Sequence, residues 1–265
     1  MPEVPQAEIG AVRNALATAG AQLTRLLRLG PDPGLPAIGA WSVGEAAAHA
    51  AASAGYFLKV ARGDREPEGL DEVAANNALF LASDPERDPL TLAERHLAGE
   101  QALLAYVDGL GTDPMVEVFC GVVAPLSTLL AVELTEVLVH GDDIARAAGL
   151  PWVIEREHAA VAAGGLLPLL PHLVDRQAAA GRRLRVELRL RGGERAILEF
   201  DDGNLRVGGA DGRSVDCRLS VDPAVFLLLT FGRTGPWRPM LKGKLAAWGR
   251  RPWLGALLPR LFERV

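Results

Sequence analysis

The stretch ELTEVLVHGDD, residues 133–143, constrains the fold more than any other part of the sequence. Glu136 and His140 stand four positions apart in it, so on an α-helix both side chains lie on one face and can reach the same ion. Leucine and valine residues surround the pair, which predicts a helix buried on most sides. A buried Glu and a buried His need partners. Those partners are either a shared metal ion or hydrogen bonds to each other and to nearby backbone.

A metal site needs a further ligand from another helix, and the best candidate is His49 in the alanine-rich stretch WSVGEAAAHAAASAGYF, residues 41–57. Asp143 follows His140 by three positions, where its carboxylate can accept the second ring N–H and fix the tautomer of that histidine. Glu133, three positions before Glu136, is a spare candidate. The pattern therefore predicts a site shared by two helices.

The other histidines and the two cysteines give no comparable pattern. We find no partner at metal spacing for these histidines and predict surface or packing positions for His96, His158 and His172. Cys120 and Cys217 lie far apart in the sequence, so a disulfide scaffold is not implied and both are predicted to be small buried side chains.

The first half of the sequence predicts helices joined by short links. Ser42 with Glu45 forms a capping box that opens a helix ending near Gly63. Leu126 to Ala148 forms the helix of Glu136 and His140, closed by Gly149. Further helices are expected over 5–29, 71–82 and 91–110, with GTDPMVEVFCG, residues 111–121, as a connector. Four long helices with short links predict an antiparallel bundle, in which metal sites are built from inward-facing side chains.

The second half changes in character. A bent or divided helix is expected from Glu155 to Ala180, because glycines and prolines interrupt it. Residues 184–220 then alternate in polarity, with Gly192-Gly193 and Asp202-Gly203 as hairpin turns. Pro223 starts an apolar helix, and PWLGALLPRLF, residues 252–262, is predicted as the last one. We place the domain boundary after Trp152, giving a helical domain over 1–152 and an α+β domain over 153–265.

Composition narrows the functional classes. The chain has 265 residues, 49% of them hydrophobic, which is enough for two modest cores. A net charge of -5 argues against a nucleic-acid binder held by a basic surface. No signal peptide and no run of about eighteen apolar residues is found, so we expect a cytoplasmic protein without stable membrane insertion.

Charge is unevenly distributed along the chain. From Arg233 onward eight Lys or Arg residues face one acid, Glu263, while the rest of the chain is acidic. This basic segment also holds Trp237, Trp248 and Trp253. One hypothesis is that it closes over the bundle and that Arg238 binds a substrate carboxylate by a bidentate contact. The competing hypothesis is a role at a membrane surface or with a fatty-acyl ligand.

WSVGEAAAH, followed by the Glu136, His140 and Asp143 arrangement, resembles the mycothiol-dependent maleylpyruvate isomerase family, one of the DinB-like metal-binding bundles. The resemblance extends to the layout of the whole chain. It implies a DinB-like four-helix bundle followed by a smaller α+β domain similar to sterol carrier protein 2. Carried over by position, it makes His49, Glu136 and His140 a zinc triad with the fourth position open for mycothiol. Gly141 and Asp142 depart from the family pattern and leave the pocket shape open.

The resemblance also implies an activity. An enzyme of this kind uses a thiolate, formed on zinc, to attack a small and anionic electrophile, either as an isomerase of maleylpyruvate type or as a thiol S-transferase. We expect it to act as a monomer or homodimer. The alternative is a non-enzymatic protein that binds lipid or another small molecule in the sterol-carrier-like domain.

Overall fold

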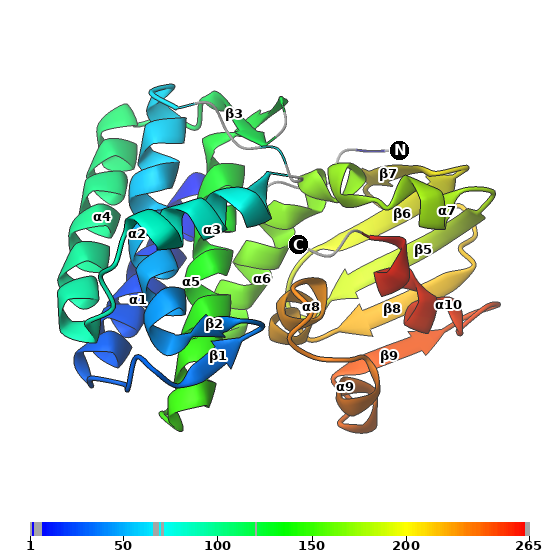
Figure 1. The fold of residues 1–265 in the computed structure, drawn as a ribbon. Helices are drawn as coiled ribbons and strands as arrows, with labels where there is room; N and C mark the ends of the chain where they lie inside the picture. Colours follow the sequence, from blue (N-terminus) through cyan, green and yellow to red (C-terminus); the bar gives the residue numbers. More distant parts are fainter. Residues whose placement is uncertain (1, 3–6, 66–68, 70–71, 120, 263–265) are drawn as a thin grey trace. The chain divides into compact units, whose positions relative to one another are not determined.

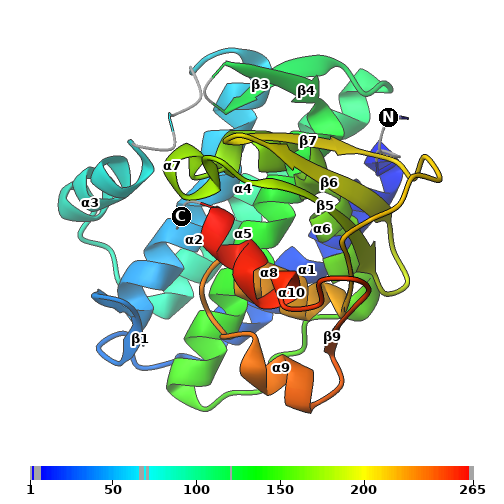
Figure 2. The same cartoon turned by 90° about the vertical axis from the view of Figure 1, so that its right-hand side faces the viewer.

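The computed structural model describes residues 2, 7–65, 69, 72–119 and 121–262. The chain divides into two compact units, Glu8–Ile154 and a second unit made of Glu155–Val265 with Met1–Ala7 (Figures 1 and 2). In the second unit, the N–H of Gly209 donates to the C=O of Pro2 at 2.8 Å. The division therefore falls two residues after the boundary expected from the sequence.

The first unit is built on four long helices. They are α1 (Ile9–Arg28), α2 (Val43–Arg62), α4 (Pro89–Leu110) and α5 (Leu126–Ala148). Helices α1 and α2 each pack on both α4 and α5, so the four surround one apolar core. The shorter α3 (Val73–Ser83) packs on α2. The predicted four-helix bundle is confirmed.

Capping residues set the ends of these helices. The hydroxyl of Ser42 accepts from the N–H of Glu45 at 3.2 Å, and the Glu45 carboxylate accepts from the N–H of Ser42 at 2.8 Å. The predicted capping box is thus confirmed. Gly63 and Gly149 end α2 and α5 in the left-handed region, at φ 74° and 67°, which glycine adopts without strain.

The prediction of a plain connector over 111–121 was wrong. Within it, β3 (Met115–Phe119) forms an antiparallel hairpin with β4 (Val122–Pro125). The alternation in MVEVF, with Val118 buried and Glu117 exposed, is the period-two pattern of a strand. A second short pair that the sequence did not predict, β1 (Pro36–Ile38) with β2 (Trp41–Ser42), precedes α2.

The second unit contains a five-stranded sheet. In spatial order the strands are β7 (Asn204–Gly208), β6 (Arg195–Asp201), β5 (Arg183–Leu190), β8 (Cys217–Val221) and β9 (Leu245–Trp248). Only β5 and β8 pair in parallel among these strands. Both predicted hairpins are present, whereas edge strand β9 was not predicted. Its four residues, LAAW, are too short to give a periodic pattern.

The second unit also contains seven short helical segments among its described residues. They are α6 (Arg156–Leu166), the 3₁₀ segment η1 (Leu167–Leu173), α7 (Arg176–Ala179), α8 (Pro223–Thr230), α9 (Trp237–Leu241), α10 (Leu254–Leu257) and the 3₁₀ segment η2 (Leu258–Leu261). The predicted helix from Glu155 to Ala180 is thus divided into three pieces. Pro168 and Pro171 lack the N–H groups that a continuous α-helix would need. The N-cap predicted before Pro223 is present, with the Asp222 carboxylate accepting from the N–H of Val225.

Strand β5 separates apolar from charged side chains. Leu184, Val186, Leu188 and Leu190 are buried on one face. The alternate residues carry charge, and Glu187 accepts hydrogen bonds from Arg189 and Arg218. One face of the sheet is therefore apolar, while the other carries a network of ion pairs. None of the helices in the described part of the chain has the length and apolar content that a bilayer crossing requires.

Candidate metal centre

Helix α2 carries the first candidate ligand. His49 lies two turns beyond the capping box, on a helix that packs on both α4 and α5. Alanine side chains make close approach of the helices possible, because a methyl group is all that separates the backbones. The buried alanines of this helix are Ala46, Ala47, Ala48, Ala50, Ala51, Ala54 and Ala61.

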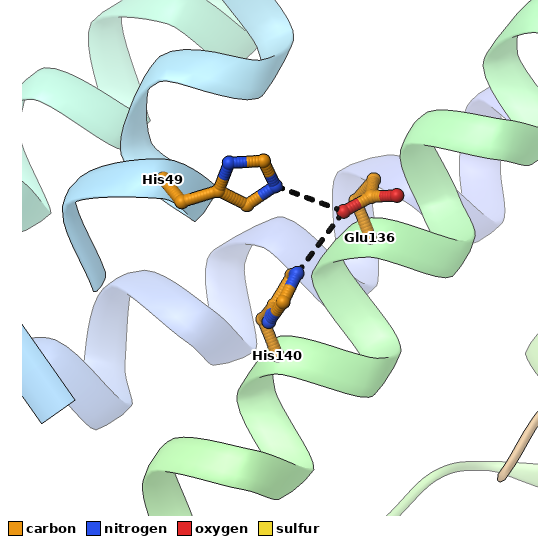
Figure 3. Close-up of side chains that lie close together, drawn as sticks. All are labelled: His49, Glu136 and His140. Carbon is orange, nitrogen blue, oxygen red and sulfur yellow. Dashed lines mark hydrogen bonds and ion pairs between the residues drawn. The ribbon is translucent and has the colours of Figure 1, made fainter. Parts of the chain in front are cut away.

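Helix α5 carries the other two candidates. Every residue from Leu126 to Thr135 is buried, and burial resumes at Val137. Glu136 and His140 lie on the face turned toward α2, and Figure 3 shows their side chains meeting that of His49. The predicted convergence of the three side chains is therefore what the geometry shows.

The three side chains meet at a single carboxylate oxygen. Glu136 Oε2 lies 3.2 Å from His49 Nε2 and 3.1 Å from His140 Nε2 (Figure 3). One donor atom from each residue lies within 4.8 Å of the other two. The side chains of His49 and Glu136 remain 17% and 22% exposed, whereas that of His140 is 8% exposed. The group is thus close to solvent on one side and enclosed by the bundle on the other.

These distances can be compared with a metal site. Zinc ligands at 2.0–2.2 Å and tetrahedral angles stand about 3.4 Å from one another. The 3.1 and 3.2 Å separations from Glu136 are close to that value, so a metal ion would need only small side-chain shifts. Two imidazole nitrogens and one carboxylate oxygen form a donor set known from catalytic zinc and from non-haem iron sites. The residues present therefore fit a divalent metal.

A further carboxylate supports His140 from behind. Asp143 Oδ2 lies 3.4 Å from His140 Nδ1, and Asp143 Oδ1 accepts a hydrogen bond of 2.7 Å from Arg146. The Asp143 side chain is fully buried. A proton on Nδ1 leaves the Nε2 lone pair directed at the centre of the site, which is the tautomer a metal ligand needs. The position predicted for Asp143 is consistent with this role.

Trp41 covers the two histidines. Its ring centroid lies 5.1 Å from that of His49 and 6.0 Å from that of His140, and the second pair is nearly stacked. Trp41 is the first residue of β2, two positions before α2 begins. Aromatic contact on both imidazoles restricts their rotation and keeps water from that side.

Mutual hydrogen bonding sets the charge of the site. Burial alone would raise the pKa of Glu136, but bonds to His140 and His49 outweigh it and hold that pKa well below its usual range. Burial would lower the pKa of His140, yet Asp143 and Glu136 together raise it to about 9. Glu136 is therefore an anion at neutral pH, as a metal ligand must be. His140 without a metal carries both ring protons at neutral pH, and it would release the proton on Nε2 when a metal binds.

A second polar group lies deeper in the bundle and was only partly predicted. Glu133 is fully buried, and its Oε1 accepts from the hydroxyl of Ser53 at 3.0 Å. Burial raises its pKa well above the usual range, which favours the neutral, protonated form. Because Ser53 lies one turn after His49, this bond ties α2 to α5 a second time, next to the three candidate ligands.

The statement that His96 lacks a partner at metal spacing was wrong. Glu100 lies four positions later on α4, with its Oε2 4.0 Å from His96 Nε2, and both side chains are buried. A Cβ at Gly20 would lie 1.9 Å from Glu100 Oε1, so a larger residue on α1 would force this carboxyl group to move. The spacing in the sequence was a sufficient signal, because it repeats that of Glu136 and His140.

The remaining predicted residues lie elsewhere. Arg238 is exposed on α9 in the second unit, and its proposed contact with a substrate stays a prediction. Cys217 is fully buried on β8, and burial raises the pKa of its thiol, which makes it a packing residue as predicted. Cys120 lies outside the described residues. His172 is exposed and His158 partly buried.

Two family models match the chain. The model described as the mycothiol maleylpyruvate isomerase N-terminal domain matches residues 10–145. The model of the SCP-2 sterol transfer family matches residues 173–249. No curated protein sequence matches the chain. Together the two models account for both the helical bundle and the sheet-containing unit.

Solved structures are also similar to this chain. A crystal structure of the mycothiol-dependent maleylpyruvate isomerase is similar with a TM-score of 0.54, 14% identity, and coverage of 91% of this chain and 92% of that one. A mutant of that isomerase with a histidine replaced by alanine gives a TM-score of 0.53 at the same identity and coverage. At 14% identity these likenesses show the fold. With more than half of its length matched by the first family model, the chain belongs to the family of the mycothiol maleylpyruvate isomerase N-terminal domain.

Proposed function

We propose that the chain is a metal-dependent enzyme that activates a low-molecular-weight thiol, mycothiol, for attack on a small electrophile. The observation that carries the proposal is the convergence of His49, Glu136 and His140, whose donor atoms lie within 4.8 Å of one another. Membership of the family adds the thiol, since the related solved isomerase is described as mycothiol-dependent. The three residues are proposed as the metal ligands.

Zinc is the metal we propose. Two histidines and one glutamate are a ligand set of catalytic zinc sites, which keep a fourth position for a water or substrate atom. When bound there, the metal and the thiol together supply a thiolate that can add to an activated double bond and leave it again. Zinc has no redox chemistry of its own, so no oxidant or reductant is required.

The protein's own residues then have distinct tasks. Asp143 holds the proton on His140 Nδ1 and so directs the Nε2 lone pair at the site. Arg146 keeps Asp143 in place through its 2.7 Å hydrogen bond. Trp41 limits rotation of both imidazoles and shields them from water. The partial exposure of His49 and Glu136 leaves an approach for a thiol.

The reaction proposed is an isomerisation of maleylpyruvate type or a thiol S-transfer. Arg238 remains our candidate for binding a substrate carboxylate, and the cytoplasm is the expected compartment because thiols stay reduced there. Thiol consumption separates the two reactions. An isomerase returns the thiol at every turnover, so sub-stoichiometric thiol suffices, whereas a transferase consumes one thiol per product.

The test begins with the metal content of the purified protein and its affinity for zinc in a chelator competition. We expect one equivalent in the wild type and its loss in His49→Ala and Glu136→Ala. His172→Ala, which changes an exposed histidine outside the site, is the matched control and retains the metal. Thiol-dependent turnover of maleylpyruvate is then measured with mycothiol. A wild-type protein without metal affinity, or turnover that survives loss of the metal, contradicts the proposal.

A further inference from the structure

Helix α9 presents an apolar face to solvent. Trp237, Met240 and Leu241 stand at i, i+3 and i+4, so they share one side of the helix. They are 67%, 36% and 89% exposed. Pro239, on the opposite side, is buried and fixes the helix to its own unit. In Figures 1 and 2, α9 lies beside the edge strand β9, which it contacts.

Cations flank this apolar face. Arg238 and the C-cap residue Lys242, four positions apart, lie on one flank of this face, and Lys244 follows two residues later. All three are exposed, and none of them forms an ion pair within the part of the chain that the structure describes. In contrast, Arg250 and Arg251 pair with Asp216, and Arg218 pairs with Glu187. The charges around α9 are therefore free for an external partner.

The surrounding sequence strengthens the positive field. Residues 223–262 contain no Asp or Glu at all, although the chain as a whole carries a net charge of -5. Trp253, also in this segment, is 61% exposed. Exposed tryptophan and leucine next to unpaired Lys and Arg are the composition of segments that settle at the boundary between lipid headgroups and acyl chains.

Two kinds of partner can be compared. A standard protein interface buries about 800 Å² on each side, more than three side chains on a five-residue helix can supply. A bilayer needs no such area, since one helical turn can insert its apolar side chains while the cations meet anionic headgroups. The combination of protruding apolar groups and unpaired cations thus favours a lipid surface.

We propose that α9 docks this chain on anionic lipid surfaces, with Trp237, Met240 and Leu241 entering the headgroup boundary and Arg238, Lys242 and Lys244 binding the headgroups. The docking is peripheral and reversible. It does not involve the three candidate metal ligands, which lie in the other unit. Because Arg238 is also our candidate for binding a substrate carboxylate, the variants below leave Arg238 unchanged.

The experiment is co-sedimentation of the full chain with vesicles of phosphatidylcholine alone or mixed with phosphatidylglycerol. We expect binding only with phosphatidylglycerol, and weakening as salt is raised. Trp237→Ser with Leu241→Ser, and separately Lys242→Glu with Lys244→Glu, are each expected to weaken binding at least about tenfold, since one surface cation contributes roughly fivefold. The lysine variant changes only exposed side chains and keeps the fold.

Matched controls lie on the helical unit. Leu79→Ser removes another leucine, 68% exposed, and Arg25→Glu with Lys59→Glu reverses two other exposed charges. Both controls are expected to bind within about twofold of the wild type. Equal binding to both vesicle types, no binding by the wild type, or wild-type binding in both α9 variants would overturn the proposal. A change of oligomeric state in the α9 variants, with no vesicle binding, would instead assign this face to self-association.

Discussion

A buried glutamate has a raised pKa in one unit and a lowered pKa in the other. Glu133 in the helical bundle and Glu187 in the sheet are both at most 9% exposed. Burial raises the pKa of Glu133 well above its usual range, and the hydrogen bond from the neutral hydroxyl of Ser53 opposes this shift only in part. Hydrogen bonds from Arg189, and then from Arg218, lower the pKa of Glu187. The neutral form is therefore favoured for Glu133, and the paired anion for Glu187.

The difference shows that burial by itself does not decide the charge of a side chain; the neighbours do. Around Glu133 in the bundle, the neighbouring side chain that bonds to it is a neutral hydroxyl, and no arginine of the described residues pairs with it. On the polar face of the sheet, arginines on adjacent strands stand beside each acid.

The largest expected effect concerns Glu100 on α4. Burial raises the pKa of Glu100 to about 8, and the charge of Arg13 opposes part of this shift. An unfolded glutamate loses its proton near pH 4.5, whereas this one keeps it to about pH 8. Stability therefore falls as pH rises across that window, by up to about 1.4 kcal/mol per unit and at most about 5 kcal/mol in total. Glu100→Gln should remove that fall.

Urea unfolding of the wild type and of Glu100→Gln from pH 4 to pH 9 measures how the free energy of unfolding changes with pH. The variant should match the wild type near pH 4 and exceed it at pH 8 and above. Glu94→Gln, an exposed glutamate on the same helix, is the control and should follow the wild type. If the stability of the wild type and of Glu100→Gln depended on pH in the same way, Glu100 would ionise normally. Burial in the bundle would then not be sufficient to keep a carboxyl group neutral.

A second effect tests how closely the bundle is packed at the site. A Cβ at Gly141 would lie 2.1 Å from the ring of Trp152, so Gly141→Ala must displace that ring. We expect a loss of about 2–3 kcal/mol in unfolding free energy. Gly10→Ala, on α1 with no atom within 4 Å of the added Cβ, should instead be neutral or stabilising. Thermal unfolding of both variants shows whether each substitution lowers or raises the stability of the protein.

The third effect concerns the carboxylate behind His140. Asp143→Asn keeps the shape but removes the charge, and supporting groups of this kind change metal affinity about 10- to 100-fold. Zinc affinity by chelator competition should fall accordingly, while the fold is retained. Asp142→Asn alters the neighbouring carboxylate, whose Oδ2 lies 3.6 Å from Arg146, and should leave zinc affinity unchanged. Equal zinc affinities in Asp143→Asn and Asp142→Asn would show that Asp143 does not support the metal ligands.

The smallest effect compares the two glutamates themselves. Glu133→Gln replaces a neutral acid by a neutral amide and should cost less than about 1 kcal/mol. Glu187→Gln removes the charge that two partly exposed arginines bind, and we expect a loss of about 1–2 kcal/mol. Urea unfolding at pH 7 decides the order. A larger loss for Glu133→Gln would mean that Glu133 is charged in the folded protein.

Much of the fold could be predicted because its signals are local. The helix from Leu126 to Ala148 was predicted with the observed bounds, since an apolar run ends at a glycine in the left-handed region. The capping box at Ser42 and the two hairpin turns of the sheet are equally local. Strand β9 was missed because its four residues hold too little periodicity to separate a strand from a loop. Strand β3 was missed although MVEVF alternates, since it lies within a stretch predicted as a connector.

For the site, the spacing of Glu136 and His140 predicted a shared face, and the position of His49 on an alanine-rich helix predicted a partner. Glu100 was missed although its spacing from His96 is the same. What distinguishes the two pairs is the third side chain, and that depends on which helices pack together. Spacing along one helix carries no information about the helix opposite.

The sequence by itself determined the helices, their caps, the change from bundle to sheet and the two residues of α5 that face inward. Only the tertiary structure decided that His49 meets them at one oxygen, that Ser53 bonds Glu133, and that the face of α9 stays open. Local preferences fix the conformation of a segment through its own backbone and side chains. Distances between segments follow from how their surfaces pack, which no single segment encodes.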